Sequence, residues 1–128
     1  MGGEERDAGT KILVVDDDEA SRAVIMRMLE GRGHTTLAAS SAEAAEEMLE
    51  EEEVHLIVAD LRMPGMSGVE LVRRARARHP QVAAIYVSGH PGDLALSPEG
   101  DAGAAAVLEK PFGREQLLGA VDDALAGG

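Results

Sequence analysis

The feature of this sequence that most restricts its fold is a regular alternation between short apolar runs and longer stretches with helical periodicity. The apolar runs, such as KILVV and VHLIVAD, are too short for buried helices and contain many β-branched residues, which is typical of strands covered on both faces. Strands that alternate with helices through right-handed connections form a parallel sheet. We therefore predict an α/β fold with a doubly wound, five-stranded parallel sheet. The predicted strands are residues 11–15, 35–39, 54–60, 82–88 and 105–109.

Capping residues locate the starts of the helices. Asp18 directly precedes apolar residues at helical spacing, so we expect it to be an N-cap rather than a ligand. Ser40 with Glu43, and Ser67 with Glu70, form the capping-box pattern that opens a helix. An apolar stripe near the C-terminus indicates the last helix. The predicted helices span residues 18–30, 40–52, 67–79 and 113–126.

Two stretches carry no clear periodicity. Residues 1–9 are small, polar and acidic, so we interpret them as a flexible leader or linker before a single domain at residues 10–126. Residues 90–103 contain two prolines and three glycines. A fourth helix there is predicted to be short or irregular, with room for little more than Asp93 to Leu96.

Composition excludes several classes of function. The absence of cysteine excludes disulfides, thiolate zinc sites and cysteine nucleophiles. A net charge of -12 repels nucleic acid and favours cations or basic partners. No apolar run approaches the roughly 18 residues of a membrane helix, and no signal peptide is recognisable, so a cytoplasmic protein without membrane contact is predicted.

Polar residues follow the predicted strands at the points where the strands end. They are Asp16, Asp17, Asp18, Asp60, Ser88 and Lys110. In a doubly wound parallel sheet these strand ends share one edge, where ligands bind. Several carboxylates at one edge repel one another unless a cation lies between them, and Mg²⁺ prefers such oxygen ligands. The lysine and the serine add a positive charge and a hydroxyl donor, so the set predicts metal-assisted phosphoryl chemistry on a carboxylate.

Each of these residues also has a purely structural interpretation. Asp16 and Asp17 alone are ordinary loop residues, and Ser88 alone can simply end a strand. Lys110 is harder to explain in this way, because a lysine directly after an apolar strand must direct its charge to water or to acids. The histidines lack the spacing of metal ligands, and we interpret them as surface or loop residues. They are His34, His55, His79 and His90.

Four motifs together carry a family resemblance. ILVVDDD, VAD followed by LRMPGMSG, YVSG and LEKPF stand in an order and spacing that resemble the receiver domain of response regulators in two-component signalling. The resemblance extends from Lys11 to about Leu125. It implies a flavodoxin-like (βα)5 fold in which Asp60 accepts a phosphoryl group from a phosphohistidine of a sensor kinase.

The resemblance also implies a role for each site residue. Asp17, Asp60 and the backbone carbonyl of Arg62 would bind Mg²⁺ directly, and Asp16 would bind it through water. Lys110 would contact the phosphoryl oxygens.

Further residues take switch and loop positions in the same pattern. Ser88 would supply the switch hydroxyl, and Pro111 follows the lysine in its loop. Val107 stands where the family often has an aromatic residue, three positions before the lysine, so gating by an aromatic side chain is not expected.

The implied partners are proteins. A sensor kinase, a hybrid histidine kinase or a histidine phosphotransfer protein would supply the phosphoryl group, and an unidentified protein would respond to it. The glycine and proline content of residues 90–103 is more like that of receivers in hybrid kinases. A stand-alone receiver, a phosphorelay shuttle and one domain of a longer kinase remain open, and a monomer or weak dimer is expected.

Two other functions fit part of the pattern. Asp16 and Asp18 have the spacing of the acids in haloacid-dehalogenase-like phosphatases, but Ala20 stands where that family has threonine or valine, and the chain has no room for a cap domain. A receiver-like interaction module that is never phosphorylated would be marked by loss of Asp60 or Lys110. Both residues are present.

Overall fold

The computed structural model of this protein describes residues 9–89 and 104–127. Five parallel strands form one sheet in the order β2-β1-β3-β4-β5, which confirms the predicted fold class. The strands are β1 (Lys11–Val15), β2 (Thr35–Ala39), β3 (Leu56–Asp60), β4 (Ala83–Ser88) and β5 (Ala104–Glu109). The helices of the described residues are α2 (Glu19–Met28), α3 (Ala42–Glu51), α4 (Gly68–Ala75) and α5 (Arg114–Gly127).

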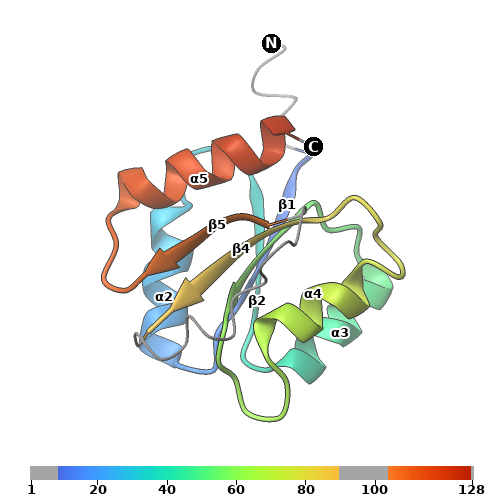
Figure 1. Ribbon diagram of the computed structural model, residues 1–128. Coiled ribbons are helices and arrows are strands. Elements are labelled where there is room, and N and C mark those ends of the chain that lie inside the picture. The colour runs from blue at the N-terminus through green and yellow to red at the C-terminus, as the bar shows by residue number, and fades with distance from the viewer. Residues whose placement is uncertain (1–8, 90–103, 128) are drawn as a thin grey trace.

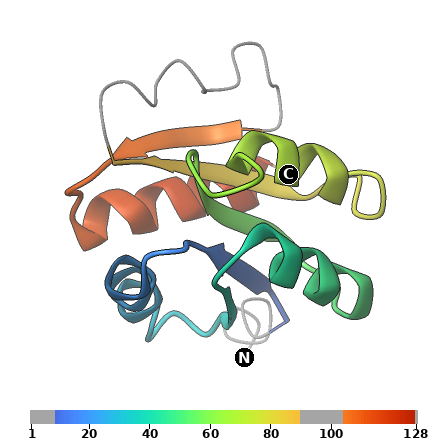
Figure 2. The same cartoon turned by 90° about the horizontal axis from the view of Figure 1, so that it is seen from below.

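Helices cover both faces of the sheet, with α2 and α5 on one side and α3 and α4 on the other (Figures 1 and 2). Successive strand side chains point to opposite faces. Ile12 and Val14 of β1 pack in the core under α2 and α5, whereas Leu13 and Val15 pack in the core under α3 and α4. This double burial explains why the strands are continuously apolar, since each buried side chain contributes roughly 1.5–3 kcal/mol relative to exposure.

In the part of the chain that the structure describes, no helix has the length and apolar character needed to span a membrane.

The helix predicted at residues 40–52 begins one residue later than expected. Ser41, rather than Ser40, is its N-cap, and the Ser41 Oγ accepts a hydrogen bond from the backbone N–H of Ala44 at 3.1 Å. Adjacent serines offer the same capping hydroxyl, so the local sequence does not distinguish them. Packing favours Ser41 as the N-cap, because Ala42 must enter the core and Ser40 lies exposed.

The helix predicted at residues 67–79 begins as expected but ends earlier. Ser67 is its N-cap and accepts the N–H of Glu70, while the regular helix ends at Ala75. The N–H of Arg78 donates to the Ala75 carbonyl at 3.0 Å, so the last turn tightens toward a 3₁₀ geometry. The predicted extension to residue 79 is therefore wrong, because the α-helical bonds give way to turns. The expected irregular fourth helix at 90–103 and residues 1–8 of the predicted leader at 1–9 lie outside the described residues.

The histidines that the structure describes lie in loops, as predicted, but they are partly buried. His55 Nδ1 accepts the backbone N–H of Lys11 at 3.0 Å, and His79 Nε2 lies 2.8 Å from a backbone carbonyl of α3. Both ring nitrogens of His34 are buried without a hydrogen-bond partner in the described residues. His90 lies outside these residues.

Gly68 allows α4 to begin directly against the end of β3. Its N–H donates to the Leu61 carbonyl at 3.2 Å, and a Cβ at this position would enter the van der Waals volume of the Asp60 carbonyl oxygen. Ala59 Cβ would also lie within 3.3 Å of such an atom. The absence of a side chain therefore sets the distance between the helix and the strand end that carries Asp60.

Replacing Gly68 by alanine is expected to destabilise the fold by about 1–3 kcal/mol, the usual cost of overpacking a tight contact. Urea unfolding measures this change. Gly119→Ala is the matched control, because Gly119 lies in α5 where an added Cβ would meet no neighbouring element within 4 Å, and alanine there is expected to stabilise the helix by up to about 1 kcal/mol. Equal stability of Gly68→Ala and the unchanged protein would show that the contact is not tight.

Candidate functional site

Three carboxylates meet where β1 and β3 end. Asp16 and Asp17 follow β1, and Asp60 is the last residue of β3, the neighbouring strand. One oxygen from each carboxylate lies within 4.8 Å of the others. Asp16 and Asp60 are buried, with 1% and 8% of their surface exposed, while Asp17 is exposed. The predicted convergence of these acids is therefore present in the structure.

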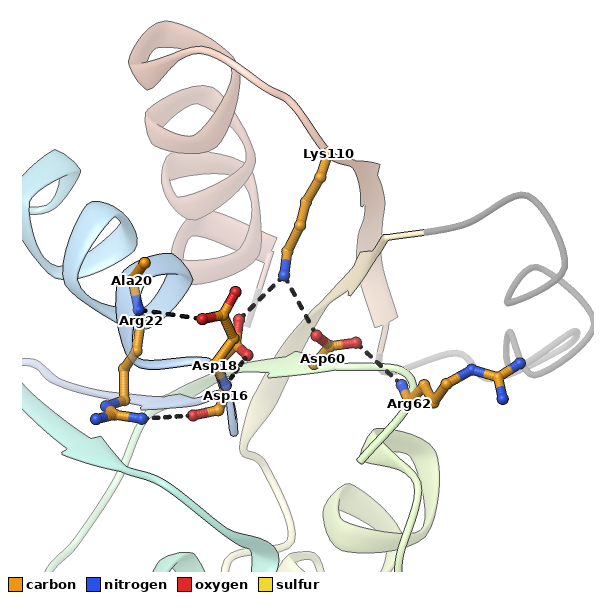
Figure 3. A network of polar contacts seen from close by, with 7 residues as sticks. All are labelled: Asp16, Asp18, Ala20, Arg22, Asp60, Arg62 and Lys110. Carbon is orange, nitrogen blue, oxygen red and sulfur yellow. Dashed lines mark hydrogen bonds and ion pairs between the residues drawn. The ribbon is translucent and has the colours of Figure 1, made fainter. Parts of the chain in front are cut away.

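Asp16 is held from several directions (Figure 3). Its N–H donates to the Ala39 carbonyl of β2, and its own carbonyl accepts a hydrogen bond from Arg22 Nη1 at 2.8 Å. Its Oδ1 accepts the N–H of Asp18 at 2.9 Å, and its Oδ2 lies 3.2 Å from Lys110 Nζ. Both carboxylate oxygens of this buried acid are thus engaged within the protein.

Asp18, in the same loop, caps the N-terminus of α2. Its carboxylate accepts the N–H of Ala20 at 3.2 Å, and it is the N-cap of α2. Its cap position accounts for an acid here without a metal.

Asp60 lies between a backbone amide and an ammonium group. Its Oδ1 accepts the N–H of Arg62 at 3.0 Å, and its Oδ2 lies 3.3 Å from Lys110 Nζ. Burial raises the pKa of the Asp60 carboxyl and the nearby Asp16 charge adds to this effect, while the Arg62 amide and Lys110 oppose it. The net pKa is above the ordinary value of 3.8, so the ionised form of Asp60 is held at a cost.

Lys110 reaches the two buried acids from the loop after β5. Its backbone N–H donates to the Ser88 carbonyl at 2.8 Å, and a cis peptide bond joins it to Pro111. Burial alone lowers the pKa of its ammonium group, but Asp16 and then Asp60 raise it, and the net pKa lies above the ordinary value. The amine therefore remains a cation between two carboxylates.

Asp17 differs from the other two acids because its carboxylate makes no hydrogen bond or ion pair with residues 9–89 and 104–127. It lines an open cleft of about 560 Å³, together with Asp60, Lys110 and Arg62. The three carboxylates provide hard oxygen donors of the kind that bind Mg²⁺. Asp17 is free at the cleft, Asp60 lies beside it, and Asp16 is buried and hydrogen-bonded. The donor set therefore fits this ion.

The predicted switch residues lie beside the site rather than in it. Ser88 ends β4 with 1% of its surface exposed, one position beyond the residue that pairs with Asp60 across the sheet. Val107 lies on β5 opposite Tyr86 and is 36% exposed. Neither residue lines the cleft in the described part of the chain.

The site has a feature that sequence reasoning missed. Arg22 reads as an ordinary exposed helix residue, yet its guanidinium reaches back to the Asp16 carbonyl (Figure 3). Its position six residues after Asp16 is the only signal in the sequence, and many unrelated pairs share this spacing.

A slightly larger hollow, of about 600 Å³, lies at the opposite ends of the strands and includes His55, His79 and Val82 in its lining. It has no group of converging carboxylates in the described residues. The chemistry of the side chains, rather than the size of the hollow, identifies the cleft at the carboxyl ends of the strands as the candidate site.

Comparison with known proteins bears on this arrangement. The sequence model of the response regulator receiver domain matches residues 12–122, which is most of the chain. The chain belongs to the response regulator receiver domain family. It is thus a receiver domain of two-component signalling.

The receiver domain is similar to proteins of different organisation. The response regulator receiver protein CpdR of Brucella abortus is 34% identical over 116 residues, which cover 90% of this chain and 96% of CpdR. The transcriptional regulatory protein FixJ of Azorhizobium caulinodans is 39% identical over 116 residues, which cover 86% of this chain and 52% of FixJ. The sensor kinase CckA of Brucella abortus is 38% identical over 117 residues, which cover 89% of this chain and 12% of CckA. The receiver domain therefore spans only part of FixJ and CckA.

Solved structures show the same fold. A response regulator receiver domain protein from Clostridium thermocellum matches with a TM-score of 0.82 and 30% sequence identity, covering 92% of this chain and 95% of that one. The five-stranded architecture is thus shared over nearly the whole receiver domain.

Replacing Asp60 by asparagine is expected to stabilise the metal-free receiver domain at neutral pH. Because the folded-state pKa of Asp60 is raised, the folded protein binds this proton more tightly than the unfolded chain does, and stability falls as the pH rises from the ordinary value through the raised one. The cost belongs to the ionised form of Asp60 and is absent well below pH 3.8, where the carboxyl group is protonated in both the folded and the unfolded state. Urea unfolding in chelator should give Asp60→Asn the higher midpoint, with an advantage that shrinks as the pH falls toward 4.

Asp123→Asn removes an exposed carboxylate from α5 and controls for the change in net charge. An Asp60→Asn advantage that is independent of pH, or matched by the control, would contradict the assigned cause.

Proposed function

We propose that this receiver domain accepts a phosphoryl group on Asp60. The donor is a phosphohistidine of a sensor kinase, a hybrid histidine kinase or a histidine phosphotransfer protein. The observation that carries the proposal is the position of Asp60, which lies within 4.8 Å of two further carboxylates and 3.3 Å from the Lys110 ammonium group. This is an acid surrounded by the groups that phosphoryl transfer requires.

The transfer forms one bond and breaks one. A carboxylate oxygen of Asp60 attacks phosphorus, the phosphorus–nitrogen bond of the phosphohistidine breaks, and the imidazole leaves with the electron pair. The product is an aspartyl phosphate and a histidine that takes up any proton from solvent. The nucleophile is the carboxylate form of Asp60, which needs no general base, and the Arg62 amide and the Lys110 ammonium group favour this form.

Mg²⁺ at this site would be bound by Asp17, Asp60 and the backbone carbonyl of Arg62, with Asp16 acting through water. When bound, the ion supplies positive charge to the oxygens of the transferring group. The engagement of both Asp16 oxygens supports the indirect role of this residue, and the free carboxylate of Asp17 supports its direct one.

Lys110 would contact an oxygen of the transferring group. Its ammonium lies between Asp16 and Asp60 and needs only a small shift to donate to a phosphoryl oxygen bound on Asp60. The Arg62 side chain, by contrast, extends away from the carboxylates (Figure 3). Its contribution is therefore the backbone rather than the guanidinium.

The response to phosphorylation would begin at Ser88. Its place at the end of β4, beside β3, allows the hydroxyl to move toward a phosphoryl group on Asp60. Val107 is branched and short, so no aromatic ring follows this movement on β5. The signal is then read by a protein partner from the surface near β4 and β5.

The domain catalyses only its own phosphorylation and a slow loss of the phosphoryl group, and it acts in the cytoplasm as a monomer or weak dimer. A phosphatase of the haloacid-dehalogenase type would instead turn over its substrate. The cap position of Asp18 weighs against that alternative, because the second acid of the phosphatase pattern here serves α2.

Asp60 is expected to be the only residue that gains a phosphoryl group. The protein is incubated with acetyl phosphate and Mg²⁺, and its intact mass is compared with that of Asp60→Asn. We expect one added phosphoryl group in the unchanged protein and in the control Asp123→Asn, and none in Asp60→Asn. A phosphorylated Asp60→Asn protein would overturn the assignment, and continuous release of phosphate without a phosphoprotein would favour the phosphatase.

Mg²⁺ is expected to stabilise the fold and to be required for phosphorylation, because the three carboxylates otherwise present their charge to an anionic donor. Millimolar Mg²⁺ in low-salt buffer should raise the Tm of the unchanged protein and of Asp123→Asn, and raise that of Asp17→Asn much less. A Tm that is indifferent to Mg²⁺ in the unchanged protein would count against the metal site.

A further inference from the structure

We infer that Arg22 is a positioning residue that orients the acidic loop after β1 for metal binding; this inference rests on the proposed function. Arg22 lies on the first turns of α2 and is partly buried. Its Nη1 donates to the backbone carbonyl of Asp16 at 2.8 Å (Figure 3). A side chain of α2 thus binds the backbone of the loop after β1, which carries two of the three acids.

The bond acts on Asp17 through the peptide plane. The carbonyl of Asp16 and the amide nitrogen of Asp17 belong to one planar unit, so fixing the carbonyl fixes the orientation of the peptide that leads into Asp17. β1 ends at Val15, and the strand ladder therefore supplies no partner for the Asp16 carbonyl. Arg22 takes the place that a strand partner has elsewhere in β1.

Asp17 depends on this support more than its neighbours do. The carboxylates of Asp16 and Asp18 are each fixed by hydrogen bonds from within the protein. The Asp17 carboxylate has no such contact with the described residues, so its direction is set by its backbone. A loss of order in the Asp16–Asp17 peptide would therefore reach a ligand whose carboxylate no other described residue holds.

Arg22 also brings a positive charge to the acidic loop without occupying a ligand oxygen. It forms no ion pair with a carboxylate in the described part of the chain, in contrast to Lys110, which contacts Asp16 and Asp60. The guanidinium thus holds the loop through the backbone and leaves the carboxylate of Asp17 available. This distinguishes it from Arg27 on the same helix, which is exposed and whose side chain has no hydrogen bond or ion pair with the described residues.

The test measures Mg²⁺ binding to the metal-free protein by calorimetry. Arg22→Met keeps the length and helix propensity of the side chain but removes the donor, and we expect it to raise the Kd about tenfold, the effect of one charge-assisted hydrogen bond. Arg22→Lys keeps one donor within reach and should bind within about threefold of the unchanged protein. Arg27→Met removes the same charge from α2 without touching the loop, and should leave the Kd unchanged.

A second readout needs no metal. The N–H of Asp18 donates to the Asp16 carboxylate, so its hydrogen exchange in the metal-free protein reports the order of the loop. We expect faster exchange in Arg22→Met than in Arg22→Lys or Arg27→Met, at equal urea midpoints. Arg22→Gln, whose amide is too short to reach the carbonyl, replaces Arg22→Met if the latter does not fold.

The outcomes separate this inference from the proposed function. If the unchanged protein binds Mg²⁺ and Arg22→Met binds it as tightly, the positioning role is wrong and the metal site stands. If Arg27→Met weakens binding as much as Arg22→Met does, charge rather than the hydrogen bond is responsible, and the role is again wrong. If the unchanged protein binds no Mg²⁺, the proposed function fails. Hydrogen exchange in the metal-free protein then decides the positioning role, which is wrong if the Asp18 N–H exchanges equally fast in Arg22→Met and in the unchanged protein.

Discussion

The contact on which the rest of the site depends is the Lys110 ammonium group between Asp16 and Asp60, at 3.2 and 3.3 Å. Three strands meet at this contact, since the acids follow β1 and β3 and the lysine follows β5. Without the cation, two buried carboxylates would face each other in a poorly solvated place and would raise each other's pKa. Burial already raises the pKa of Asp60, and the Lys110 ammonium group opposes this effect. Such an arrangement favours the binding of a cation beside the acids.

The loops that carry Asp16 and Lys110 lead into two helices, α2 and α5, that contact each other. Arg114, at the start of α5, donates from Nε to the Met28 carbonyl and from Nη2 to the Glu30 carbonyl, both at 3.0 Å, which caps the end of α2. An ion pair of 2.7 Å between Arg32 and Asp122 adds a second contact between the end of α2 and α5. The helix after the acidic loop and the helix after the Lys110 loop therefore form one support. Exposed ion pairs contribute little individually, and the capping bonds are the stronger part of this joint.

Much of this structure follows from the sequence because its strongest signals are local. The continuous apolar runs identify strands buried on both faces, and the position of Asp16, Asp60 and Lys110 directly after such runs places them at one edge of the sheet. Features that depend on distances between elements were not predictable. The choice of Ser41 over Ser40 depends on how α3 packs, and the contacts of Arg22 and Gly68 with backbone carbonyls appear only once the helices lie on the sheet. The sequence marks these residues by type but gives no indication of what they contact.

In the proposed reaction Asp60 receives the phosphoryl group while the neighbouring acids hold Mg²⁺ and Lys110 neutralises the transferred charge. A crystal structure of the protein with Mg²⁺ and beryllofluoride tests this division of roles most directly. We expect beryllium bound to a carboxylate oxygen of Asp60, a fluoride in contact with Lys110 Nζ, and the metal bound by Asp17 and Asp60. Beryllofluoride at another residue, or a metal bound away from these carboxylates, would contradict it.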